Sequence, residues 1–328
     1  MQSQSKPITI SILIPVYNVA DYVEECLNSI LAQIDDNAEI IVMNDASTDN
    51  SWEVLKAYQT HPKITLVQAP HNRGLSGTRN ALLPLATNQY VWFIDSDDAM
   101  HDGAYTKVVN ALASMDIDML GGNYMAWRGD NKRPKKAFVG PANQIINNDS
   151  LQFIKNIVEN NSNHVWNKVY KRSVIEKISF QQGKKFEDIY YMTDLSKVIK
   201  NFAFIDYPLI DYRERQGSIV QTLDKKYVDD YLNAFIYRVD TWYELNPNSS
   251  NDKFSNYLWY KTFNRFAGLV KKLDDAAQHD MIVYVNMRYA STFFEYQQQA
   301  AARLDWLRCL RSKYEAKKIK QLLMRYCS

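Results

Sequence analysis

Four short apolar runs alternate with amphipathic stretches near the start of the chain, and this order restricts the possible folds more than any other feature. The runs at 8–14, 39–43, 64–68 and 90–94 have the length and the β-branched or aromatic content of buried strands. Helical spacing of apolar residues at 19–33 and 52–58, and a further predicted helix at 78–86, fill the intervals. Strands that alternate with helices form parallel sheets with right-handed crossovers. The sequence therefore predicts an α/β fold.

Three local signals set the expected boundaries of these elements. Pro15 should end the first strand, because proline cannot donate a hydrogen bond to a sheet ladder. Ser47 or Thr48 should cap the helix through 52–58, since their hydroxyls can accept from free N–H groups. The glycine-containing segment 72–77 is expected to be a turn.

Composition and charge exclude several classes of protein. The 328 residues allow one large or two ordinary domains, and 46% hydrophobic with 23% charged residues is typical of a globular protein. A formal net charge of only +2 lacks the excess that nucleic-acid binding requires, so no nucleic-acid partner is predicted.

Cysteine usage and hydropathy suggest where the chain works. Cys26, Cys309 and Cys327 are few and odd in number, which favours a reducing compartment over a disulfide framework. The polar first residues lack the apolar core of a signal peptide, and no apolar run is long enough to span a bilayer. A cytoplasmic protein is expected, either unattached or peripheral at the inner face of the membrane.

Polar residues follow the predicted strands, and the most informative group is acidic. Asn18, Asp45 and Asp95 each come after a strand, so a parallel sheet would bring them to one crevice. Segment 95–98 holds three aspartates, whose repulsion is costly unless solvent or a cation compensates it. Mg²⁺ commonly combines one or two carboxylates with phosphate oxygens. The segment is either a metal-assisted nucleotide site or a polar loop after a core strand.

Two familiar nucleotide sites are excluded by the turn after the first strand. A dinucleotide-binding protein needs Gly-x-Gly-x-x-Gly there, but the chain has Pro-Val-Tyr-Asn at 15–18. A P-loop needs a longer glycine-rich loop that ends in Gly-Lys-Ser/Thr, and the sequence has none. A nucleotide-sugar enzyme, which holds its diphosphate with a metal, fits the residues that are present.

Residues 8–100 resemble the donor-binding half of glycosyltransferase family 2, which has the GT-A fold. Four segments carry the resemblance, in family order and at family spacing: 14–18, 44–49, 72–80 and 93–98. Asn44 departs from the pattern, because the family more often has an acid there. The resemblance implies a Rossmann-like, mostly parallel sheet flanked by helices, with an α-helical C-terminal module.

The resemblance also implies roles on the donor side. Tyr17 would offer an aromatic face to the nucleoside, and Asp45 would accept a hydrogen bond from the ring N–H of uracil, which favours a UDP-linked donor. Asp97 would ligate Mn²⁺ or Mg²⁺ directly, with Asp95 near the ribose and the metal. The implied donor-binding residues are Pro15, Tyr17, Asn18, Asp45, Arg73, Arg79, Asp95 and Ser96. Two alternatives stay open: a structural role for Asp45 as a turn residue, and a pairing of Arg79 with a carboxylate instead of the diphosphate.

On the acceptor side, the Glu-Asp pair at 187–188 resembles the start of the family's acceptor-side helix. Asp188 matches the position of the catalytic base and Glu187 is its neighbour, although such a pair can also merely cap a helix. Trp166, Asn167 and Lys168 resemble the segment that shapes the acceptor side, where Trp166 could equally be a core anchor. Arg213 and Arg215 resemble a flexible loop that closes on the diphosphate, with Gly217 allowing the motion.

The chain is expected to divide into a GT-A domain at 1–222, with nucleotide-sugar binding at 1–100 and the acceptor side at 101–222, and a helical module at 223–328. Segment 303–325 has eight basic and two acidic residues, a net +6 among interspersed apolar side chains. This pattern suits a basic amphipathic helix on an anionic membrane surface, or a terminal helix packed on its own protein with a solvated basic face.

These observations predict an inverting, metal-dependent glycosyltransferase. It would move a sugar from a nucleotide diphosphate donor to a hydroxyl of a glycan or lipid-linked saccharide, in synthesis of bacterial capsule, lipopolysaccharide or exopolysaccharide. A nucleotidyltransferase of related fold is the first alternative, although its glycine-rich loop and N-terminal lysine are missing. A non-catalytic carbohydrate- or membrane-binding protein is the second, and the joint presence of Asp97 and Asp188 argues against it.

Overall fold

The computed structural model describes residues 7–281 except 139, 140, 148, 216–223, 249–251, 271, 275, 278 and 279. Two compact units divide the chain, Met1–Gln216 and Gly217–Ser328. The predicted basic helix at 303–325 lies outside the described residues, as does Gly217. The first unit contains every strand and every predicted site residue that the structure describes.

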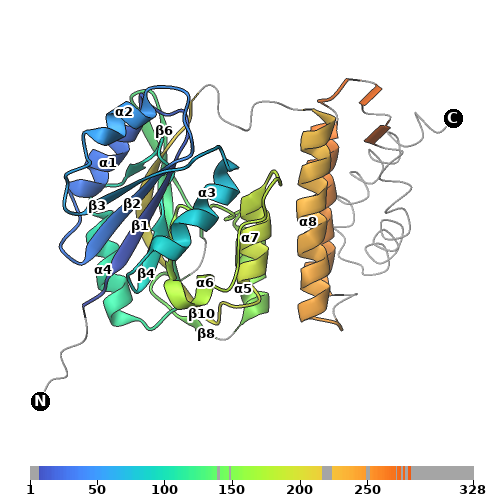
Figure 1. The fold of residues 1–328 in the computed structure, drawn as a ribbon. Helices are drawn as coiled ribbons and strands as arrows, with labels where there is room; N and C mark the ends of the chain where they lie inside the picture. Colours follow the sequence, from blue (N-terminus) through green and yellow to red (C-terminus); the bar gives the residue numbers. More distant parts are fainter. Residues whose placement is uncertain are drawn as a thin grey trace, which may run out of the picture. The chain divides into compact units, whose positions relative to one another are not determined.

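The first unit is built on one sheet (Figure 1) whose order is β3-β2-β1-β4-β9-β6-β10-β5, with β7 paired to β6 and β8 to β10. The strands β1 to β4 are mutually parallel, and β6 is parallel to β10. Only β9, β5 and the two short additions run antiparallel to their partners. The mostly parallel sheet is confirmed. The strands are β1 Ile10–Val16, β2 Ala38–Asn44, β3 Ile64–Gln68, β4 Tyr90–Phe93, β5 Ala99–Met100, β6 Met119–Arg128, β7 Asn131–Lys135, β8 Ile146–Asn147, β9 Lys168–Lys171 and β10 Asn201–Arg213.

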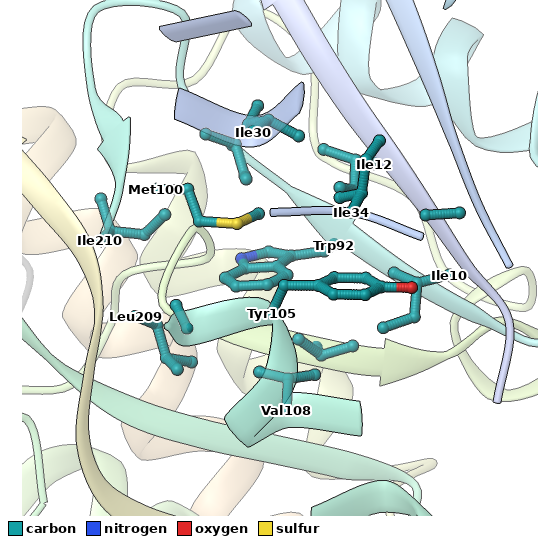
Figure 2. Packing of buried hydrophobic residues seen from close by; sticks show 14 of the residues in the cluster. Ile10, Ile12, Ile30, Ile34, Trp92, Met100, Tyr105, Val108, Leu209 and Ile210 are labelled. Carbon is teal, nitrogen blue, oxygen red and sulfur yellow. The ribbon is translucent and has the colours of Figure 1, made fainter. Parts of the chain in front are cut away.

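Helices cover both faces of this sheet because alternate strand residues point to opposite sides. Ile12 packs in a cluster with residues of α1, α2 and α4, and Figure 2 shows this core around Trp92 and Tyr105. Leu13 belongs to the other cluster, which contains residues of α3, α5, α6 and α7. The helices are α1 Val23–Leu31, α2 Ser51–Lys56, α3 Gly74–Leu82, α4 Ala104–Ser114, α5 Ser150–Glu159, α6 Arg172–Ile175 and α7 Glu187–Leu195, with a 3₁₀ turn at Leu83–Leu85.

Strand β1 continues through Pro15, where it was expected to end. The pairing of β1 with β4 stops at Leu13 and Phe93. The carbonyl of Leu13 accepts from Ile94 on the β4 side, whereas the carbonyl of Val16 accepts from Asp45 on the β2 side. Since these directions alternate along a strand, the missing N–H of Pro15 faces the side where pairing has ended. The proline therefore costs the sheet little.

The expected cap of α2 was wrong. Ser47 and Thr48 instead bond the loop after β1: the Asn18 N–H donates to Ser47 Oγ at 3.1 Å, and the Thr48 N–H donates to Asn18 Oδ1 at 2.8 Å. Helix α2 begins later, at Ser51, after Asn50. The two hydroxyl residues thus hold neighbouring loops together at the carboxyl ends of β1 and β2.

Helix α3 starts at Gly74, four residues before the expected 78, and ends at Leu82. The reason is a cap supplied from a distant strand. The carboxylate of Asp45 accepts from the backbone N–H groups of Arg73 and Gly74 at 2.8 and 2.9 Å. These groups are among the free donors at a helix start, so one buried aspartate allows the glycine-containing segment to be helical.

The second unit is described through two helices, α8 Lys225–Leu245 and α9 Lys253–Val270, which contact each other. The helical C-terminal region is confirmed, with a break between the two helices that includes residues 246–248. The Trp242 indole N–H donates to Ser255 Oγ at 2.9 Å and joins the pair. Within the described part of the chain, we find no helix with the length and apolar content to cross a bilayer.

Strand β6 approaches β10 closely at Gly121, which gives a test of the packing. A Cβ there would lie 2.5 Å from ring carbons of Phe204, whose ring is stacked on Phe138 at 4.0 Å. We expect Gly121→Ala to lower the free energy of unfolding by about 1–3 kcal/mol, because overpacking displaces a fixed ring. Urea denaturation measures this. Gly268→Ala is the control, since its Cβ meets nothing within 4 Å and alanine favours the helix; an equal loss in both variants would contradict the argument.

Candidate active site

Strand β4 delivers three aspartates to the rim of the sheet, and the deepest is Asp98. This carboxyl is 1% exposed. Its Oδ1 accepts from the backbone N–H of Arg213 at 2.8 Å, and its Oδ2 has no hydrogen-bond partner among the described residues. Burial raises the pKa of Asp98 well above its usual value, and the charges of Asp97 and Asp95 raise it further. Burial and the neighbouring acids thus both oppose the charged form of Asp98.

Arg79 joins this acidic turn to the start of helix α7. The side chain is buried, and its Nη2 donates to Asp95 at 2.6 Å while Nη1 donates to Glu187 at 3.2 Å. Burial opposes its charge, but Asp95, Glu187 and then Asp188 outweigh burial, so the pKa of Arg79 is raised. Of the two alternatives left by the sequence, the structure has the carboxylate pairing. The acidic turn and the Glu-Asp pair, 92 positions apart at Asp95 and Glu187, thus lie together.

Helix α7 begins with the predicted acceptor-side acids, Glu187 and Asp188, in its first turn. Phe186 precedes them in the left-handed region at φ 61°, which is uncommon for a bulky residue and fixes the entry of the chain. Asp188 Oδ1 accepts from the N–H of Ile189 at 2.8 Å. Its charge raises the pKa of Arg79 and opposes the lowering of the pKa of Lys168, so Asp188 lies near both residues.

Two arginines, at and just after the end of β10, also contact the acidic turn. Arg215 Nε donates to Asp97 Oδ2 at 2.7 Å. Arg213 is the last residue of β10, so the predicted flexible loop begins after it. Its guanidinium lies 3.6 Å from the ring centroid of Trp127, pairs with Glu25 at 2.5 Å and donates to the carbonyl of Asp97. Arg213 is thus a fixed clamp on the turn.

The predicted donor side forms the rim next to this turn. Tyr17 is 47% exposed, which leaves its ring available to a flat ligand. Asn18 is exposed with a positive φ of 52°, and its side chain is bonded to Thr48. Asp45 is buried and caps α3, while Arg73 is exposed at that cap. Pro15 and Ser96 are buried.

On the predicted acceptor side, Trp166 is buried within a group of rings. Its ring is stacked on Tyr212 at 5.1 Å and on His164 at 4.7 Å, and it meets the edge of Tyr124 at 5.0 Å. The sequence analysis singled out only Trp166 in this cluster. Tyr124 and Tyr212 lie on β6 and β10, and no local feature of the sequence predicts that these two strands pair.

Lys168 is fully buried, which no feature of the sequence predicted. Its ammonium donates to Ser162 Oγ, the carbonyl of His164 and Asn167 Oδ1 at 2.6–3.1 Å. Burial lowers the pKa of Lys168 to about 7, against the opposing effect of Asp188. The Asn167 amide in turn donates to the carbonyl of Gly122 at 2.8 Å, so the segment is fixed to β6.

The donor set of the turn suits a divalent cation only with help from a ligand. Within the described residues, no three His, Cys, Asp or Glu side chains are arranged to hold a metal ion by themselves. Mg²⁺, however, needs just one or two protein carboxylates when phosphate oxygens and water complete its shell. Asp97 and Asp95 supply hard oxygen ligands two positions apart in one turn, and the residues therefore fit such an ion.

Sheet order, the acidic turn and the facing Glu-Asp pair define a class: an α/β transferase domain of the GT-A type. The model for Glycosyl transferase family 2 matches residues 11–179, more than half of the chain. The protein belongs to glycosyltransferase family 2.

Individual relatives agree with this assignment. The chain is 30% identical to the glycosyltransferase EpsH of Bacillus subtilis over 232 residues, which is 69% of this chain and 67% of EpsH. It is 28% identical to the glycosyltransferase GlyA of Streptococcus pneumoniae over 236 residues, or 70% of this chain, but spans only 34% of GlyA. Among solved structures, residues 1–349 of S. aureus TarS align with a TM-score of 0.66 at 16% identity, covering 97% of this chain and 90% of TarS 1–349. At that identity the likeness concerns the fold.

The buried bridge made by Arg79 gives the first test of the site. Arg79→Met leaves Asp95 and Glu187 without their cation, and we expect a loss of about 3–5 kcal/mol in the free energy of unfolding. Arg79→Lys should lose less, because it keeps the charge but cannot reach both acids with a planar fork. Chemical denaturation measures both. Arg73→Met, an exposed change at the same helix start, should stay within about 0.5 kcal/mol; equal stability of all variants would refute the bridge.

Lys168 predicts a pH dependence of stability. Its folded pKa of about 7 is below the usual 10.5, so the unfolded chain binds more protons between these values and stability should rise with pH there. Relative to Lys168→Met, the wild-type free energy of unfolding should gain about 1.4 kcal/mol per pH unit from pH 7 to 9. Below pH 7 the difference should be flat. Lys177→Met, at an exposed site, should show no such slope, and parallel curves for both comparisons would contradict the burial effect.

Proposed function

We propose that the protein is an inverting glycosyltransferase that moves a sugar from a nucleotide diphosphate donor, with UDP as the expected nucleotide, to an acceptor hydroxyl. The observation that carries the proposal is the Arg79 bridge, which joins the acidic turn and the Glu-Asp helix start in one site. A donor diphosphate at the turn and an acceptor at Asp188 would then meet across a single sugar. One-step displacement needs this opposed arrangement of leaving group and base.

In this proposal Asp188 is the general base that takes the proton of the attacking hydroxyl. Glu187 is less suited, because its carboxylate is engaged with Arg79. Asp188 occupies the same first turn and faces the segment of Lys168, which lies on the predicted acceptor side. The incoming hydroxyl attacks the anomeric carbon as its proton passes to Asp188, and the bond to the nucleoside diphosphate breaks.

The donor would lie along the rim of the sheet. Tyr17 offers an exposed ring to the base, and Asp45, whose N–H donates to the carbonyl of Val16 next to Tyr17, caps the start of α3. Asp97 and Asp95 would hold Mn²⁺ or Mg²⁺, which neutralises negative charge on the departing diphosphate when bound. Arg215, already paired with Asp97, is close enough to the turn to add positive charge at the same place.

The biological setting belongs to the proposal as well. TarS has been solved with UDP and with UDP-GlcNAc, and EpsH and GlyA are bacterial glycosyltransferases. We infer a saccharide or lipid-linked saccharide acceptor in bacterial surface polysaccharide synthesis. A cytoplasmic location, peripheral to the inner face of the membrane through segment 303–325, would bring the enzyme to such an acceptor.

A donor screen tests the proposal. Nucleotide sugars are incubated with the protein and Mn²⁺, and the released nucleoside diphosphate is measured, since slow donor hydrolysis does not need an acceptor. We expect release from one or a few UDP-sugars and its loss when the metal is chelated. A protein that binds no nucleotide sugar and releases no diphosphate with any of them would end the proposal.

Two substitutions separate the roles of the acids in that assay. Asp97→Asn should remove metal-dependent release and weaken UDP binding in the presence of Mn²⁺. Asp188→Asn should keep UDP binding but lower turnover by roughly 10²–10⁴, as expected for a lost general base. Asp102→Asn, the same change at an exposed position, serves as the control. Equal loss of UDP binding in the Asp188 variant would show that this residue is structural.

A further inference from the structure

The hairpin formed by β6 and β7 is strongly basic at its turn and along β7, and this part lies at the surface. Its turn and flanks, residues 128–136, contain five cations and one acid, a net charge of +4. Every residue of this segment is exposed. The cations are Arg128, Lys132, Arg133, Lys135 and Lys136, and the acid is Asp130.

Only one of these cations has a carboxylate partner in the described structure. Lys132 pairs with Asp211 at 2.5 Å and lies 4.2 Å from the ring centroid of Trp127. The other four have no carboxylate oxygen within 4.0 Å among the described residues. Like charges that gather without counter-charges repel one another, so the hairpin is predisposed to bind an anion.

Register places two of the unpaired cations beside the aromatic cluster of the acceptor side. Arg133 is opposite Ala126 and Lys135 is opposite Tyr124 across the β6–β7 pair. Side chains directly opposite each other share a face, with Cβ atoms about 4.5–5.5 Å apart. The partly buried ring of Tyr124 in turn meets the buried Trp166, so Lys135 and Arg133 lie next to the part of this cluster that reaches the surface.

We propose that the β7 face bearing Arg133 and Lys135 binds phosphate groups of the acceptor, next to a sugar received by the cluster of Tyr124, Trp166 and Tyr212. This inference rests on the proposed function and narrows its acceptor to phosphate-bearing saccharides. Arginine and lysine are the usual partners of phosphate, and aromatic faces suit the apolar faces of sugars. The ligand would lie along the strand.

Two simpler explanations account for less. A bilayer would meet the tip of the hairpin first, but the tip is Gly129-Asp130-Asn131, with an acid and no apolar side chain to enter the interface. Protection of an edge strand explains Pro134 and the presence of lysine, since β6 is the one partner of β7 among the described strands. Edge protection does not require the cations to lie beside Tyr124.

Binding of a short linear inorganic polyphosphate, measured by isothermal titration calorimetry at low salt without nucleotide sugar, tests the inference. Arg133→Gln/Lys135→Gln should weaken binding roughly tenfold. Lys177→Gln/Lys200→Gln, which removes the same charge from exposed positions of the same unit, should leave it nearly unchanged. Circular dichroism serves as the check that both double variants are folded. Sedimentation with phosphatidylglycerol vesicles forms a second arm, in which the hairpin variant should match wild type.

Equal effects of the two double variants on polyphosphate binding would overturn the inference and leave edge protection as the explanation. Loss of vesicle binding in the hairpin variant would also overturn it, in favour of a membrane contact. The donor screen is independent of both arms. If wild type released no nucleoside diphosphate, the proposed function would fail while the phosphate-binding result stood.

Discussion

The candidate site depends on the buried cation of Arg79. Charge is tolerated at such depth only when partners compensate it, and both partners are carboxylates from other segments of the chain. The guanidinium also lies 5.2 Å from the ring centroid of Phe180, a residue whose backbone is bonded twice to Asn80 of the same helix. Helix α3, the end of β4 and the start of α7 are therefore held in one arrangement by charge and not by apolar contact alone.

The remaining charges at the turn form a second level that is balanced less completely. Asp97 is neutralised by Arg215, while Asp98 is buried with a raised pKa and has one oxygen without a partner among the described residues. Such a turn is stable in the free protein because Arg213 and Arg215, at and just after the end of β10, offset its acids. A ligand that brings its own cation and phosphates changes this balance, and the partly exposed pair of Asp97 and Arg215 can respond without unfolding the core.

The sequence predicted the fold well where a signal is local. The apolar run of β3 has the expected bounds, because a buried strand declares itself by its own residues. It failed where a distant residue decides: Asp45 starts α3 from another strand, and Pro15 is tolerated because β4 ends early. The acids of the site were found as motifs, whereas the burial of Lys168 depends on β9 lying between β4 and β6 in the sheet, a pairing of distant segments.

Strand β6 has one part whose place is indicated by its own residues and another part whose role depends on its partner strands. Its first half, through Gly121, is a core strand between β9 and β10. A side chain at Gly121 itself would strike Phe204. Its second half leaves the core, carries Tyr124 and continues into the basic hairpin. The predicted donor-side residues lie before 100, but Arg213 and Arg215 also contact the acidic turn, and Arg213 packs on Trp127 of β6. Changes at Arg133 and Lys135 of β7 leave these contacts in place. In the proposed function, such changes would alter acceptor choice on a donor site that the fold keeps fixed.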